Sequence, residues 1–159
     1  MKIEFRGKDI KTGEWRYGNI IYSLDAVEGF DAIIIPKNNN NMFARPDEKS
    51  DLGFEVWHKV DPKTVGQYTN VNTHRGEKIF QGDVVTVKHT EIAYKKHTPF
   101  GVKVGYAPDE DFIGVVEFLE GMWVVNNRVD KMILLWSETN ESEILGNIHD
   151  NPELLEVPE

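Results

Sequence analysis

The chain has 159 residues, no cysteine and a formal net charge of −9, and this length fits a single domain with its own apolar core. The absence of cysteine excludes disulfides, thiolate zinc sites and cysteine nucleophiles, while the apolar runs are far shorter than the about 20 residues that span a bilayer. Because the amino terminus also lacks the pattern of a signal peptide, we expect a soluble cytoplasmic protein without membrane contact.

Short strands dominate the expected secondary structure of the amino-terminal half. Alternating, β-branched and aromatic residues predict strands at 3–6, 15–22, 31–36 and 54–60. The four asparagines from Asn38 to Asn41 have no means of burial and predict an exposed loop.

A turn-and-corner segment occupies the middle of the chain. After a strand at 65–69, a polar turn ends at Gly76, which can take a positive φ. Gly82 is expected to make a tight corner, where the Asp83 carboxylate can accept a hydrogen bond from its own neighbouring backbone. Residues 84–87 then form a central strand, because β-branched residues occupy both of its faces.

The last third of the chain adds strands and a helical turn. Asn151 before Pro152 is typical of a helix start, so residues 151–155 predict a short helical turn. We expect a mostly β fold, a small partly closed barrel with one or two short helices, because closure removes exposed strand edges. The remaining expected strands are 112–119, 122–125, 131–136 and 144–148, with Glu120-Gly121 as a hairpin turn.

Three blocks of sequence are distinctive enough to serve as motifs. They read VGQYT at 65–69, GEKIFQGDVV at 76–85 and GNIHDNPELL at 146–155, and they follow the opening IEFRG at 3–7. Together they resemble the YopX family of bacteriophage and prophage proteins. The resemblance implies a phage- or prophage-derived protein in a bacterial host cell, with a YopX-like β fold and an SH3-like strand pattern. It implies no activity, no cofactor and no catalytic residue.

The resemblance also implies a single YopX-like domain over residues 1–159. Within it, residues 1–60 would form an amino-terminal β portion, and residues 61–159 a barrel core with an acidic carboxy-terminal segment. The residues that carry its structural motif are Gly66, Tyr68, Gly76, Gly82, Asp83, Gly146, Asn151 and Pro152.

One segment suggests binding of single-stranded nucleic acid. Residues 137–159 carry seven acids and no lysine or arginine, so the rest of the chain is nearly neutral. Between Lys88 and Lys103, lysines alternate with aromatic residues, and such binders use cations for phosphates and ring faces for bases. Solvated lysines on a β-hairpin are the alternative. The residues that would form this site are Lys88, Tyr94, Lys95, Lys96, Phe100 and Lys103.

Other chemistry has weaker support in the sequence. The five histidines form no close pair with metal-ligand spacing, so we expect no metal and no cofactor. Asp83, Asp109 and Asp111 could serve a carboxylate- or metal-dependent enzyme, although the acids at 109–111 also fit a solvated turn.

Three functions therefore remain open. The first is a non-catalytic accessory protein that acts as a protein-interaction or oligomeric module, its partner being a further copy, a host protein or a phage protein. The second is a single-stranded nucleic-acid-binding module, and the third is a small enzyme. We favour the first because the residues form no reactive constellation and because the resemblance implies no activity.

Overall fold

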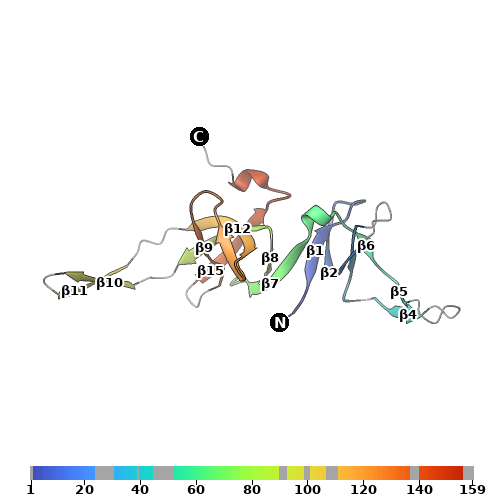
Figure 1. The fold of residues 1–159 in the computed structure, drawn as a ribbon, viewed down its shortest axis with the longest axis horizontal. Coiled ribbons are helices and arrows are strands. Elements are labelled where there is room, and N and C mark those ends of the chain that lie inside the picture. The colour runs from blue at the N-terminus through green and yellow to red at the C-terminus, as the bar shows by residue number, and fades with distance from the viewer. Residues whose placement is uncertain are drawn as a thin grey trace. The chain divides into compact units, whose positions relative to one another are not determined.

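A computed structural model describes residues 2–23, 31–38, 40–44, 52–89, 93–98, 101–106, 111–136 and 140–155. Strands take up most of these residues, accompanied by two short 3-10 turns (Figure 1). The protein is mostly β and its sheets are antiparallel, as predicted. By its internal contacts the chain divides into two compact units, Met1–Tyr68 and Thr69–Glu159.

A sheet ordered β6-β3-β2-β1-β7-β8 starts in the first unit. Its strand β7 crosses the boundary between the units, because the boundary falls after Tyr68. The division predicted at residue 60 falls just before the 3-10 turn η1 (Pro62–Thr64) and stays a prediction. The strands of this sheet are β1 (Phe5–Lys8), β2 (Trp15–Tyr22), β3 (Ala32–Ile35), β6 (His58–Lys59), β7 (Gly66–Asn72) and β8 (Lys78–Phe80).

The core of the first unit is small. Ala32, Ile34 and Val60 are buried together, and Ile20 and Val65 pack against them. A second contact joins β1 to β2, where the buried Arg6 guanidinium lies 4.5 Å from the ring centroid of Trp15, a geometry that favours cation–π attraction.

The predicted strand at 54–60 is wrong, because two short strands replace it. β5 (Leu52–Phe54) pairs with β4 (Met42–Ala44), whereas β6 pairs with β3. Between β5 and β6, the side chain of Asn40 accepts a hydrogen bond from Val56 N (3.0 Å) and donates one to Val56 O (2.7 Å). These bonds occupy the backbone groups of Val56, so the chain bends there. Residues 38–41 were expected to form an exposed loop. Asn40 is instead half-buried, so the expectation is wrong at this residue.

The second unit is built on a five-stranded antiparallel sheet ordered β14-β13-β12-β9-β15. The predicted central position of residues 84–87 is confirmed, since β9 pairs with β12 on one side and β15 on the other. The strands are β9 (Asp83–His89), β12 (Phe112–Leu119), β13 (Met122–Asn126), β14 (Met132–Leu134) and β15 (Asn140–Asn147). The buried core of this unit is formed by Ile79, Val85, Val87, Val116, Val125 and Leu135.

Two turns of the second unit depend on left-handed backbone. Glu120 and Gly121, which connect β12 to β13, have φ of 50° and 82°, the positive pair that a type I′ hairpin turn requires. Gly82 has φ of 84° at the corner before β9. There Phe80 N donates to the carboxylate of the buried Asp83 at 2.8 Å, so Asp83 binds neighbouring backbone as expected.

The blocks that carry the resemblance end in a second 3-10 turn, η2 (Pro152–Leu155), where the helical turn is predicted. Gly146 in β15 lets this turn approach closely, because a Cβ there would lie 2.4 Å from Asn151 Oδ1 and 2.9 Å from Leu154 Cδ1. Within the described residues, no helix is long and apolar enough to cross a membrane.

Candidate functional site

The six residues predicted to bind nucleic acid lie on different elements. Lys88 is in β9, while Tyr94, Lys95 and Lys96 are in β10 (Ala93–Thr98). Lys103 is in β11 (Gly101–Tyr106), which pairs with β10 so that Lys96 lies opposite Lys103. Figure 1 shows β10 and β11 as a two-stranded hairpin. Phe100 lies outside the described residues, so nucleic-acid binding stays a prediction.

The acids considered for catalysis do not form one site among the described residues. Asp83 is 1% exposed and already accepts the Phe80 N–H, whereas Asp111 is exposed just before β12. Asp109 lies outside the described residues. Where the structure is described, no group of three or more His, Asp or Glu side chains is placed to hold a metal ion.

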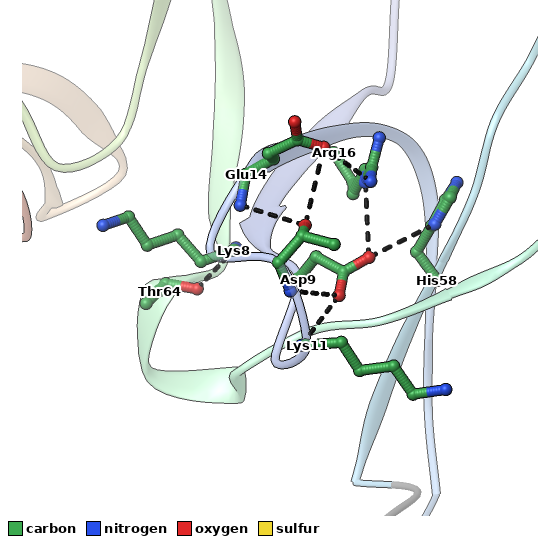
Figure 2. Close-up of polar contacts among 8 residues, drawn as sticks. Lys8, Asp9, Lys11, Glu14, Arg16, His58 and Thr64 are labelled. Carbon is green, nitrogen blue, oxygen red and sulfur yellow. Dashed lines mark hydrogen bonds and ion pairs between the residues drawn. The ribbon is translucent and has the colours of Figure 1, made fainter.

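A cluster of polar side chains in the first unit surrounds Asp9 (Figure 2). Its carboxylate accepts from Lys11 N at 2.9 Å and from Thr12 N at 3.3 Å. Arg16 Nε lies 3.3 Å and His58 Nδ1 3.4 Å from Asp9 Oδ2. The hydrogen bonds from Lys11 first, then Thr12 and Arg16, lower the pKa of Asp9, although burial opposes the shift.

This cluster is best understood as a structural connection. Asp9 closes its own turn, since Gly13 N donates to Asp9 O and Asp9 N donates to Glu14 O. Its carboxylate then ties this turn to β2 through Arg16 and to β6 through His58. A cavity of about 310 Å³ lies beside it, lined by Asp9, Lys11, Trp57, His58 and Lys59. The His58 ring contacts the Asp9 carboxylate, which fits a role in this structural connection.

A different kind of surface lies on β12, β13 and β14 of the second unit. On this face Leu119 is the register partner of Met122, and Val124 is the partner of Leu134. Met132 precedes Leu134 by two residues, so it lies on the same face of β14. Four long apolar side chains are exposed here, at 37% for Leu119, 46% for Met122, 57% for Met132 and 49% for Leu134. We call these four residues the apolar face.

Beside the apolar face lies a shallow cavity of about 370 Å³ with a charged rim. Glu117 accepts from Arg128 Nη2 at 2.7 Å and from Asn126 Nδ2 at 2.9 Å. The turn itself is fixed because Asn127 Oδ1 accepts the N–H groups of residues 129–131 at 3.0–3.1 Å. The lining residues are Leu119, Asn126, Arg128, Val129, Asp130, Lys131 and Met132.

Sequence reasoning did not identify the apolar face. The strands themselves were predicted, but alternation alone does not say which face of a strand is covered by the rest of the chain. The same is true of the Asp9 cluster, because Arg16 and His58 reach Asp9 from 7 and 49 positions away in the sequence.

Comparisons with known proteins bear on the fold. The chain is similar to protein EF1440 from Enterococcus faecalis, known from a crystal structure, with 19% sequence identity and a TM-score of 0.53 over 98% of this chain and 99% of that one. At this identity the similarity concerns the fold alone. No curated protein matches the chain. The family model described as "YopX protein" matches residues 4–156, and the chain therefore belongs to the YopX family.

Proposed function

We propose that this protein is a non-catalytic accessory protein of phage or prophage origin that acts as a homo-oligomer through its apolar face. The observation that carries the proposal is the gathering of Leu119, Met122, Met132 and Leu134, all exposed, on three adjacent strands. Single exposed apolar residues are ordinary, but a contiguous group rimmed by polar residues is typical of an interaction surface.

The charges of the rim favour a second copy of this chain as the partner. Lys131 and Asp130 lie next to each other on the lining of the same cavity. In a two-fold interface each patch faces itself, so a rim that carries both signs can pair lysine with aspartate twice. A partner of one charge sign would leave one of the two groups opposite a like charge.

The expected strength of this contact follows from the exposure of its side chains. Leu134 is 49% exposed, and complete burial of a leucine yields about 2 kcal/mol. Covering the exposed half therefore yields about 1 kcal/mol per copy, or about 2 kcal/mol in a two-fold dimer, where the residue counts twice. Loss of this binding free energy corresponds to a dimer dissociation constant that is about 30-fold higher.

Light scattering on a sizing column, over a dilution series, tests the proposal. We expect the unmodified chain to elute as a dimer or larger and Leu134→Glu to elute as a monomer, because a carboxylate cannot be buried against the apolar face without a partner. Ile10→Glu is the matched control, since Ile10 is similarly exposed at 54% but belongs to the first unit. A monomeric unmodified protein at all concentrations, or an unchanged oligomer for Leu134→Glu, would overturn the proposal.

A further inference from the structure

A cavity of about 200 Å³ in the second unit, here called the Thr86 cavity, lies at the β9–β15 side of the sheet. Its lining residues are His74, Arg75, Thr86, Lys88, Glu141, Ser142 and Glu143. Arg75 Nη2 lies 3.1 Å from Glu143 Oε1, and Lys88 is opposite Glu141 in the β9–β15 register. The charges of these lining residues are therefore matched and favour no class of ligand.

The cavity of about 310 Å³ beside Asp9 differs, because positive groups dominate its wall. Its lining residues are Asp9, Lys11, Trp57, His58 and Lys59. The Asp9 carboxylate already accepts from Lys11 N at 2.9 Å and from Thr12 N at 3.3 Å. It also accepts from Arg16 Nε at 3.3 Å, and the Asp9 side chain is only 9% exposed. Because this carboxylate is occupied within its own cluster, the two lysines set the charge of the cavity.

The backbone brings the two lysines together from positions 48 residues apart in the sequence. Ile10 N donates to Lys59 O at 3.1 Å, which joins the turn that carries Lys11 to β6, the strand that carries Lys59. In Figure 2 the Lys11 side chain and the His58 ring lie on the same side of Asp9. An anion in the cavity would therefore meet two cations whose backbone positions are fixed before it binds.

Trp57 gives the same cavity an aromatic wall. Its side chain is 44% exposed, although tryptophan is a residue that folded proteins usually bury well. Both neighbours of Trp57 are held in place. The backbone of Val56 is bonded at both polar groups to the Asn40 side chain, and His58 pairs with Ile34 in β3. The half-exposed ring is thus positioned in advance, which lowers the entropy cost of stacking a planar group on it.

The size and the lining together define the ligand class. The volume of about 310 Å³ lies at the lower end of the range of ligand pockets, about 300 to 1,000 Å³, so the cavity has room for one small ligand. Lysines bind phosphate groups as point charges, and aromatic side chains stack on nucleic-acid bases. A ligand that satisfies both carries a phosphate next to a planar ring, as a single nucleotide does.

We propose that this cavity binds a nucleoside monophosphate, with its phosphate between Lys11 and Lys59 and its base against Trp57. The same chemistry occurs in a free mononucleotide and at the phosphorylated end of a nucleic-acid strand. The site is separate from the predicted nucleic-acid segment at Lys88–Lys103, because its residues belong to the first unit. It is also independent of the proposed oligomer, which uses strands of the second unit, so either proposal can fail without the other.

Isothermal titration calorimetry and thermal unfolding of the full chain with adenosine monophosphate test the proposal. Adenosine and inorganic phosphate supply the two halves of this ligand separately. We expect the nucleotide to bind at least about tenfold more tightly than either half, because each half lacks either the charge-assisted contact or the stacking. Equal binding of phosphate would show a simple anion site, and equal binding of adenosine a site for the base alone. Either result would overturn the proposal, as would the absence of both heat and a melting shift with the nucleotide.

A short single-stranded oligonucleotide with a terminal phosphate separates the two sources of the ligand. If a strand end is the ligand, this oligonucleotide should bind at least as tightly as adenosine monophosphate and should weaken when the terminal phosphate is removed. If the free nucleotide is the ligand, the oligonucleotide should bind more weakly than the mononucleotide. Both results support the nucleotide site and assign its source.

Two substitutions test the arrangement within the cavity. Trp57→Ala should weaken nucleotide binding at least about fivefold, whereas Trp57→Phe should retain most of the affinity. Lys11→Met keeps the alkyl chain and removes the charge, so it should weaken nucleotide binding about tenfold and leave the affinity for adenosine unchanged. Lys63→Met is the matched control, since Lys63 is an exposed lysine of the first unit that does not line the cavity.

Melting temperatures separate these binding effects from misfolding. Trp57 and Lys11 are both exposed, so their variants should melt close to the unmodified protein. Unchanged nucleotide affinity in both Trp57→Ala and Lys11→Met would overturn the site.

Discussion

The Gly82-Asp83 corner offers a direct test of how one side chain holds the second unit together. Asp83 is 1% exposed and its carboxylate accepts from Phe80 N at 2.8 Å, while Phe80 itself is 2% exposed. Water therefore cannot replace the acceptor when the carboxylate is removed. Asp83→Ala leaves a buried N–H without a partner, which costs about 1–3 kcal/mol.

This loss should be visible as a shift of the unfolding transition. For a chain of this length, 1 kcal/mol corresponds to about 2–4 °C in melting temperature, so a loss of about 2 kcal/mol predicts a decrease of about 4–8 °C. Thermal unfolding followed by circular dichroism measures it. Urea unfolding followed by tryptophan fluorescence gives an independent value of the free energy, provided that the two probes report coincident transitions.

Asp83→Asn is the matched control for Asp83→Ala. Asparagine keeps an oxygen in the position that accepts the Phe80 N–H, so it should retain more than half of the stability that alanine loses. If Asp83→Asn is as destabilised as Asp83→Ala, the negative charge rather than the acceptor is what matters at this corner. If Asp83→Ala has the same melting temperature as the unmodified protein, the backbone at Gly82 forms the corner without the Asp83 carboxylate, and the reasoning fails.

The remaining predictions concern the first unit and the β10–β11 hairpin. Because the folded-state pKa of Asp9 lies below its ordinary value of 3.8, its stabilising effect is complete above that pH and is lost as the pH falls through the lower folded pKa. The stability difference between the unmodified protein and Asp9→Asn, measured by urea unfolding across the acid range, should therefore shrink toward acid; a constant difference would contradict this. Gly18→Ala should destabilise the protein by about 3 kcal/mol, because the new Cβ would lie 2.0 Å from the backbone oxygen of Ile35. A free energy of unfolding close to that of the unmodified protein would refute the clash. Finally, if the hairpin binds single strands, polarisation of a labelled oligonucleotide should fall steeply with salt, and replacing Lys95 and Lys96 by alanine should flatten that slope; no binding at low salt would remove this function.

The strands with the clearest local signal were predicted with the bounds that the structure has. β2 at Trp15–Tyr22 and β12 at Phe112–Leu119 coincide with the predicted strands, because each is bounded by turn formers and is rich in aromatic or β-branched residues. The turn at Glu120-Gly121 was predictable for the same reason, since few residue pairs tolerate two positive φ angles.

The strand at 54–60 shows where local reasoning fails. Its alternation is real, but the side chain of Asn40, sixteen positions earlier, occupies the backbone of Val56 and bends the chain. Nothing in the residues around Val56 reports this contact. Strand propensity within a short window predicts secondary structure poorly when a distant side chain competes for the same backbone groups.

The cavity at Thr86 was beyond the reach of the sequence for a related reason. Of its seven lining residues, only Lys88 was predicted to belong to a site, the one for nucleic acid. The pairing of β15 with β9 is what brings Glu141 opposite Lys88 and Glu143 opposite Thr86. A shift of the register by one residue would turn these side chains to the other face, so the site exists only through a pairing that spans more than fifty residues.

The apolar face and the Thr86 cavity lie at opposite ends of one sheet, so a substitution at one should not affect the other. The strand order β14-β13-β12-β9-β15 places the apolar face on the first three strands and the cavity on the last two. Mutations at sites that share no partner have nearly additive effects. Leu134→Glu should therefore abolish self-association, while Thr86→Val, in β9, should leave self-association unchanged. If Thr86→Val instead weakens the oligomer as well, the sheet couples its two ends, and the self-association does not depend on the apolar face alone.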